Sequence, residues 1–187
     1  MELLAPAGSR QALTAAVQSG ADAVYLGGPQ FGARYSAENF TIEEMKTWVD
    51  YCHLYGVDVH VTVNTLVKEK EIESLKEYLK QLNKIGVDAL IVQDMGAVEI
   101  IKKTVPDMTL HASTQMTVTS LEGVKYLENM GFSRVVLARE LSEKEIEHIC
   151  KNAKAEIEVF VHGAICMCYS GQCLMSSILG GRSGNRG

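Results

Sequence analysis

Short apolar runs rich in Val, Ile and Leu alternate along the chain with stretches of helical spacing. Runs of this kind, bounded by glycine and polar residues, predict the buried strands of a parallel sheet, and the stretches between them predict covering helices. We predict seven strands, over 2–5, 23–27, 57–63, 89–92, 109–112, 134–138 and 157–161.

The predicted helices carry recognisable first turns and apolar faces. A capping box pairs a Ser or Thr before the helix with a Glu three residues later, and each side chain accepts from a backbone N–H of the other residue. The chain has three such pairs: Thr41 with Glu44, Thr119 with Glu122, and Ser142 with Glu145. The stretch 68–84 is typical of an outer helix, because apolar residues occupy one face and Glu and Lys the other.

Strict alternation of strand and helix requires a parallel sheet, either doubly wound or closed into a barrel. The chain has no Gly-x-Gly-x-x-Gly phosphate fingerprint, and we therefore predict an α/β fold of the TIM-type (β/α)8 barrel. A complete barrel takes about 250 residues, whereas this chain has 187. We expect an incomplete barrel of about seven βα units, forming one domain over 1–187 with a cysteine-containing loop region at 163–187.

Composition narrows the class of protein further. The chain is 47% hydrophobic and 22% charged, with a mean hydropathy of +0.02, which excludes extensive disorder and a membrane span. The N-terminus lacks the pattern of a signal peptide, so we expect a cytoplasmic location. The net charge of −5 argues against a generally basic nucleic-acid surface but permits a local basic patch.

Polar residues follow most of the predicted strands, where barrel enzymes place their active sites. Arg139 is the strongest candidate for gripping a carboxylate or phosphate, because a guanidinium makes a two-bond fork. Its alternative role is an ion pair with Glu140 or with another carboxylate of the barrel. Several other residues of the set have the alternative role of capping the next helix. The full set is Asn64, Gln93, Asp94, His111, Ser113, Gln115, Arg139, Glu140 and His162.

Three of the five cysteines lie between residues 166 and 173. In a reducing compartment such clustering points to metal or redox chemistry before disulfides. Cys166 and Cys173 are candidate ligands for zinc or an iron–sulfur cluster, and a cluster usually takes four ligands. The alternative is that Cys166 and Cys168 are small buried residues. Cys52 and Cys150 lie on predicted helices, and we interpret both as packing residues.

At this segment the chain resembles a known family. The residues 158–176 contain the pattern Glu-x-Phe-x-x-Gly-Ala-x-Cys-x6-Cys, and the segments 2–8, 20–28 and 181–187 add to the likeness. Together they resemble the peptidase U32 family, also called collagenase-like proteases.

The resemblance implies oxygen-independent hydroxylation. Some members of the family hydroxylate the wobble uridine of tRNA with prephenate as the co-substrate, others hydroxylate a cytidine of large-subunit rRNA, and a third branch serves ubiquinone synthesis. It also implies a 4Fe–4S cluster with four cysteine ligands. Two of these match Cys166 and Cys173, the other two are expected beyond Gly187, and Cys168 matches none.

An RNA hydroxylase of this family would use the polar residues in two roles. We assign Arg139, Glu140, His162, His111 and Gln115 to catalysis. We assign the binding of the substrate and of RNA phosphate to Asn64, Gln93, Asp94, Arg182 and Arg186.

Two other functions stay open. A peptidase would need a Cys–His pair, Cys166 with His162 or His111, because the chain has neither a Gly-x-Ser-x-Gly nor a His-Glu-x-x-His motif. A thiol bound to a cluster cannot also act as that nucleophile. The chain could instead be an inactive barrel fragment that needs a partner. An unclosed barrel exposes strand edges and an apolar interior, which favours self-association.

Overall fold

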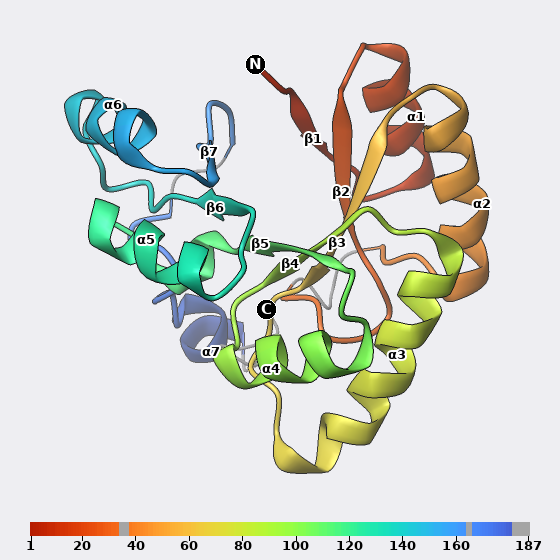
Figure 1. Ribbon diagram of the computed structural model, residues 1–187. Helices are drawn as coiled ribbons and strands as arrows, with labels where there is room; N and C mark the ends of the chain where they lie inside the picture. Colours follow the sequence, from red (N-terminus) through yellow and green to blue (C-terminus); the bar gives the residue numbers. More distant parts are fainter. Residues whose placement is uncertain (34–37, 164–165, 181–187) are drawn as a thin grey trace. The chain divides into compact units, whose positions relative to one another are not determined.

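The computed structural model describes residues 1–33, 38–163 and 166–180 (Figure 1). The chain divides into two compact units, Met1–Met108 and Thr109–Gly184. Within each unit, strands and helices alternate along the chain as the sequence predicts.

The first unit holds four parallel strands, and each pairs with the next along the chain. The register sets Ala23 opposite Asp58 and His60 opposite Ala89. Every residue of β4 is buried, as expected for a strand covered on both faces. The strands are β1 (Leu4–Pro6), β2 (Ala23–Gly27), β3 (Asp58–Val63) and β4 (Ala89–Val92). The helices are α1 (Arg10–Gln18), α2 (Ile42–Leu54), the short η1 (Glu69–Glu71), α3 (Ile72–Ile85) and α4 (Met95–Thr104).

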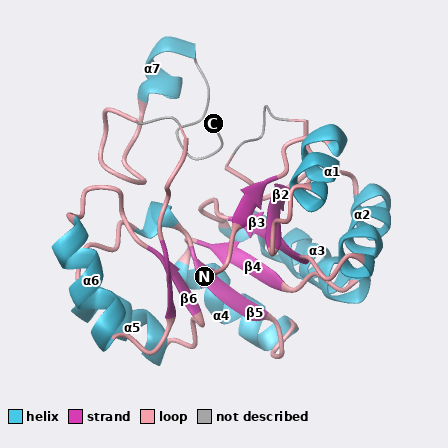
Figure 2. Ribbon diagram, turned by 90° about the horizontal axis from the view of Figure 1, so that it is seen from above, coloured by secondary structure: helices cyan, strands magenta, loops and turns pink. Residues whose placement is uncertain are grey.

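The second unit holds three parallel strands, again paired in chain order. Two of its helices, α5 and α6, pack against each other (Figure 2). The strands are β5 (Thr109–Ala112), β6 (Arg134–Val136) and β7 (Glu156–Glu158). The helices are the short η2 (Thr114–Met116), α5 (Leu121–Asn129), α6 (Glu143–Asn152) and α7 (Met175–Gly180).

Pairing in chain order is the strand order of a (β/α) barrel, whereas a doubly wound sheet reverses direction at a switch point. The predicted bounds of β2, β4 and β5 are confirmed. The capping boxes of Thr41 with Glu44 and of Ser142 with Glu145 are also confirmed.

Several predictions at element ends are wrong. The strand predicted over 2–5 is β1 at Leu4–Pro6, and the strand predicted over 134–138 ends at Val136. The cap of α5 is Ser120 rather than Thr119, because the extended Ser120 accepts a hydrogen bond from the backbone N–H of Gly123. The strand predicted over 157–161 begins and ends earlier, at Glu156–Glu158, because its neighbour β6 stops at Val136. The apolar side chains of Val159, Phe160 and Val161 are consequently exposed.

The core of each unit is aliphatic. In the first unit it includes Leu13, Leu75, Leu79 and Leu90, and all four are fully buried.

No helix among the described residues combines the length and the apolar character needed to cross a membrane.

Candidate metal site

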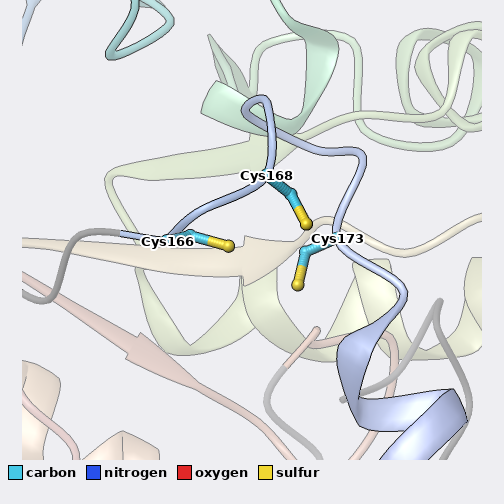
Figure 3. Close-up of side chains that lie close together, drawn as sticks. All are labelled: Cys166, Cys168 and Cys173. Atoms are coloured by element: carbon cyan, nitrogen blue, oxygen red, sulfur yellow. The ribbon is translucent and has the colours of Figure 1, made fainter.

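Three cysteines of the second unit meet in the segment 166–173, which we call the cysteine loop. The donor sulfurs of Cys166, Cys168 and Cys173 all lie within 4.8 Å of one another. Figure 3 shows the three side chains close together. Cys166 is exposed, and the other two are partly exposed. This arrangement can hold a metal ion, because thiolates at such separations can share one centre.

Ser170 anchors the cysteine loop to the segment that follows β6. Its side chain is almost fully buried, with 2% exposed. The backbone N–H of Ser170 donates to Glu140 Oε1 at 3.0 Å, and its hydroxyl donates to Glu140 Oε2 at 3.0 Å. The Ser170 hydroxyl also accepts from the backbone N–H of Arg139 at 3.2 Å.

A second anchor comes from the segment that follows β5. The Thr117 hydroxyl donates to the Ser170 carbonyl at 2.6 Å. Next to it, Gly171 has a φ of +75°, and a Cβ there would lie 2.4 Å from the Gln115 carbonyl oxygen. Any side chain at 171 would therefore collide with backbone, so the turn requires glycine.

Arg139 faces the backbone of the cysteine loop. Its guanidinium donates to the carbonyl of Cys168 at 3.3 Å and to that of Cys166 at 3.5 Å. Arg139 and Glu140 therefore both bind the cysteine loop, Arg139 through its guanidinium and Glu140 through its carboxylate. These contacts differ from the ion pair between the two residues that was the alternative role predicted for Arg139.

The surroundings of the thiols favour charge on Cys166. A hydrogen bond from the Cys168 backbone N–H, a second from the Cys173 side chain and the nearby Arg139 guanidinium lower the pKa of Cys166. The hydrogen bond with Cys173, together with desolvation and the other thiols, raises the pKa of Cys168. Cys166 is accordingly the first of the two to ionise as pH rises.

The carboxyl of Glu140 is held in its charged form. Desolvation acts against the charge, but the hydrogen bonds from the Ser170 N–H and hydroxyl outweigh it and lower the pKa of Glu140. The loop is therefore anchored by a carboxylate across the neutral pH range.

The remaining predicted catalytic residues occupy different surroundings. His111 lies in β5 and is buried. Gln115 lies in η2, and its backbone carbonyl lies close to Gly171. His162 is exposed and lies past the end of β7, so it does not end a strand as predicted.

The predicted substrate-binding residues of the first unit have structural contacts. Asn64 Oδ1 accepts from the backbone N–H of Ala33 at 3.0 Å. Asp94 caps α4, as its alternative role foresaw, and also accepts from the Val67 N–H at 2.8 Å. Gln93 is partly exposed beside it. The other two, Arg182 and Arg186, lie outside the described residues.

Two interpretations of the cysteines are corrected. Cys166 and Cys168 are not small buried residues, because the loop that carries them runs over the surface of its unit. Cys52 is buried in α2 as predicted, but Cys150 is exposed, because it lies on the outer face of α6.

The sequence interpretation missed the parts that position the loop. The family resemblance assigns no ligand role to Cys168, because this residue matches none of the family's ligands, although the spacing Cys-x-Cys is compatible with one. Ser170, Gly171 and Thr117 are small residues in turns, and only the contact between distant segments reveals their role.

Comparison with known proteins gives one family. The sequence model of peptidase family U32 matches residues 8–187. A 23S rRNA 5-hydroxycytidine synthase of Escherichia coli is 45% identical over all of this chain and 28% of its own length. A tRNA hydroxylation protein of Bacillus subtilis is 41% identical over all of this chain and 44% of its own length. The chain thus spans less than half the length of these curated relatives.

Among solved structures, a U32 peptidase superposes with a TM-score of 0.71 at 21% identity, over 85% of this chain and 68% of its own. A thiamine phosphate pyrophosphorylase from Pyrococcus furiosus superposes with a TM-score of 0.59 at 16% identity, over 84% and 73%. At these identities the likeness shows the fold alone, and it confirms the predicted incomplete α/β barrel.

Proposed function

This chain belongs to peptidase family U32, and we propose that it forms the cysteine-bearing barrel part of an oxygen-independent RNA hydroxylase. The substrate would be tRNA or large-subunit rRNA, the two classes named in its relatives at 41% and 45% identity. The observation that carries the proposal is the gathering of three cysteine sulfurs within 4.8 Å in a chain so similar to RNA-hydroxylating proteins.

An iron–sulfur cluster is the cofactor of this proposal, and the donor set suits one. Cys166 and Cys173 would hold it, since thiolates are the usual ligands of such clusters. A cluster of this kind supplies one-electron redox chemistry when bound. The protein's own contribution is the anchoring by Ser170, Gly171 and Glu140, which fixes where the thiols lie.

Arg139 is the proposed binding residue for a prephenate-like donor. A guanidinium has five N–H groups, and two carbonyls of the cysteine loop accept from it among the described residues. The other N–H groups could bind a carboxylate beside the loop. RNA phosphate is assigned to Arg182 and Arg186 on sequence grounds, with cytoplasmic RNA as the partner.

The first experiment measures iron, sulfide and the visible absorption spectrum of protein purified without oxygen. The wild type should carry iron and sulfide, and Cys166→Ala and Cys173→Ala should each lose them. Cys150→Ala is the matched control, because this exposed cysteine lies on α6 and should leave the iron content unchanged. Iron that persists in both loop variants would contradict the proposed ligands.

The RNA assay follows from the same samples. RNA from cells that lack the gene should regain one hydroxylated pyrimidine, seen by mass spectrometry, when the wild-type gene is restored. The Cys166→Ala and Arg139→Gln variants should restore much less. Full restoration by Cys166→Ala would rule out a cluster-dependent hydroxylase.

A cysteine peptidase is the second candidate, because hydrogen bonds and Arg139 lower the pKa of the exposed Cys166 thiol. In that case Cys166 would be the nucleophile, with His162 or His111 as its base. Iodoacetamide should then label Cys166 faster than Cys150 in iron-free protein and abolish cleavage of gelatin. Iron in the purified protein, with no cleavage before labelling, would decide against this candidate.

A further inference from the structure

We propose that Cys168 is a metal ligand and that it makes the cysteine loop a three-thiolate site for a single divalent ion such as Zn²⁺. Cys168 has no place in the ligand pair Cys166 and Cys173 assigned above. A single ion held by all three would compete with the iron–sulfur cluster for the same sulfurs. Only this competition rests on the proposed function; the ion site itself does not.

The spacing of the sulfurs suits one ion. In a tetrahedral zinc site with Zn–S bonds of about 2.3 Å, the sulfurs lie about 3.8 Å apart. The three sulfurs of the loop are already within 4.8 Å of one another, so a shift of about 1 Å or less in side-chain position closes the site. A cluster instead uses one cysteine for each of its irons, and the pair Cys166 and Cys173 assigned to it does not include Cys168.

The three cysteines leave a fourth position open. Cys166 is exposed, while Cys168 and Cys173 are partly exposed, so an ion can enter from solvent. A zinc site with three protein ligands keeps water or another small ligand in the fourth position. On binding, each thiol releases its proton to the solvent and coordinates as a thiolate.

The charge around the loop matches such a site. Three thiolates and one divalent ion leave a single net negative charge. Arg139 lies against the same loop through the Cys166 and Cys168 carbonyls, so its positive charge offsets that excess. Ser170 and Gly171 separate Cys168 from Cys173 and hold the turn that brings the two sulfurs together.

A bound divalent ion would occupy Cys166 and Cys173 and thereby block assembly of the cluster. Cys168 would then set the balance between the two metals, since it ligates the single ion and is not needed by the cluster. The chain would be most easily loaded with iron when zinc is scarce.

Cadmium titration of the metal-free, reduced chain tests the site without reference to activity. We expect one Cd²⁺ per chain and a sulfur-to-cadmium charge-transfer absorption in the ultraviolet. Cys168→Ser should lose about a third of that absorption and weaken binding at least about tenfold, since even outer-shell partners contribute 10- to 100-fold to metal affinity. Cys150→Ser, the matched control in the same unit, should bind like the wild type.

Equal cadmium affinity and absorption in Cys168→Ser and wild type would overturn the proposal, and so would a wild type that binds no cadmium. The competition has its own readout. In protein reconstituted with iron and sulfide in the presence of Zn²⁺, Cys168→Ser should retain more iron than the wild type. Cadmium binding that depends on Cys168, in protein that never assembles a cluster, would sink the proposed function and leave the ion site standing.

Discussion

Two carboxylates that each follow a strand, Asp94 in the first unit and Glu140 in the second, differ in what they hold. Asp94 accepts from the backbone N–H groups of Ala97 at 3.0 Å and Val67 at 2.8 Å, and thereby joins a helix start to a loop of its own unit. Glu140 accepts from Ser170 and thereby holds the cysteine loop. A position after a strand therefore predicts that the residue is polar, but it does not predict which segment that residue binds.

The second unit also exposes a run of large apolar side chains toward its C-terminal end. In the second unit, large apolar side chains are exposed through much of the segment 159–179, and Val161 is 86% exposed. Where such side chains gather in one patch, the patch is typical of an interaction site. Self-association through an unclosed barrel stays a prediction for this surface. The exposed residues are Val159, Phe160, Val161, Met167, Tyr169, Leu174, Met175, Ile178 and Leu179.

The largest effect is expected at the turn of the cysteine loop. Gly171→Ala would push a Cβ to 2.4 Å from the Gln115 carbonyl at a φ of +75°. The anchored conformation of the loop should become less stable by about 3 kcal/mol, the upper end for a strained residue. We therefore expect the loop to detach from Gln115 and its affinity for cadmium to fall. The measurement is cadmium titration of the variant.

Gly20→Ala is the matched control for this prediction. Gly20 also has a positive φ, +84°, but nothing lies within 4 Å of its Cβ position. It should cost only about 1 kcal/mol of strain and leave the metal affinity unchanged. Equal metal affinity in the Gly171 and Gly20 variants would show that contact with Gln115 does not hold the loop.

A smaller effect is expected in the first unit. Asp94→Ala removes the acceptor of two backbone N–H groups, and we expect a loss of about 2 kcal/mol in the free energy of unfolding. Urea denaturation measures this loss. Cadmium affinity should stay at the wild-type value, and Asp107→Ala, at an exposed carboxylate, should change neither quantity. Weakened cadmium binding in Asp94→Ala would contradict the inference that Glu140, and not Asp94, holds the cysteine loop.

The smallest effect concerns Glu140 and pH. Its pKa in the folded protein lies below the usual 4.5, so its contribution to loop anchoring is complete above pH 4.5. That contribution is lost as pH falls through the lowered pKa, because the protonated carboxyl no longer accepts two hydrogen bonds as an anion. The protection factor of the Ser170 amide, which corrects its exchange rate for the intrinsic pH dependence, should fall over that interval in the wild type. Glu140→Gln should exchange faster already at neutral pH and show no such step.

Most of the fold could be predicted because short stretches of sequence determine its strands and helices. The apolar runs gave β2, β4 and β5 at their observed bounds, and the capping boxes located the starts of α2 and α6. The predicted end of the last strand was wrong. Val159, Phe160 and Val161 are apolar enough for a strand, but β6 ends at Val136 and offers them no residues to pair with. The local sequence pattern shows which residues favour a strand, whereas the length of the strand depends on how far the neighbouring strand extends.

The candidate site could be predicted only in part, for a related reason. Cys166, Cys173, Arg139 and Glu140 were identified by type and spacing, and three of these four contact or flank the turn at Ser170. The contacts of Thr117 with the Ser170 carbonyl and of Gln115 with Gly171 join segments more than fifty residues apart. Nothing in the local sequence of either segment encodes that meeting.

The contact of Gly171 with Gln115 also determines where the chain tolerates a change of length. An insertion between Cys168 and Gly171 would shift the first two sulfurs relative to the fixed turn, and an insertion between Gly171 and Cys173 would shift the third. The same insertion placed after Cys173 would leave all three sulfurs in position. Diversity introduced into this protein, by evolution or in a library, is therefore best accommodated downstream of Cys173, with the spacing from Cys166 to Cys173 kept constant.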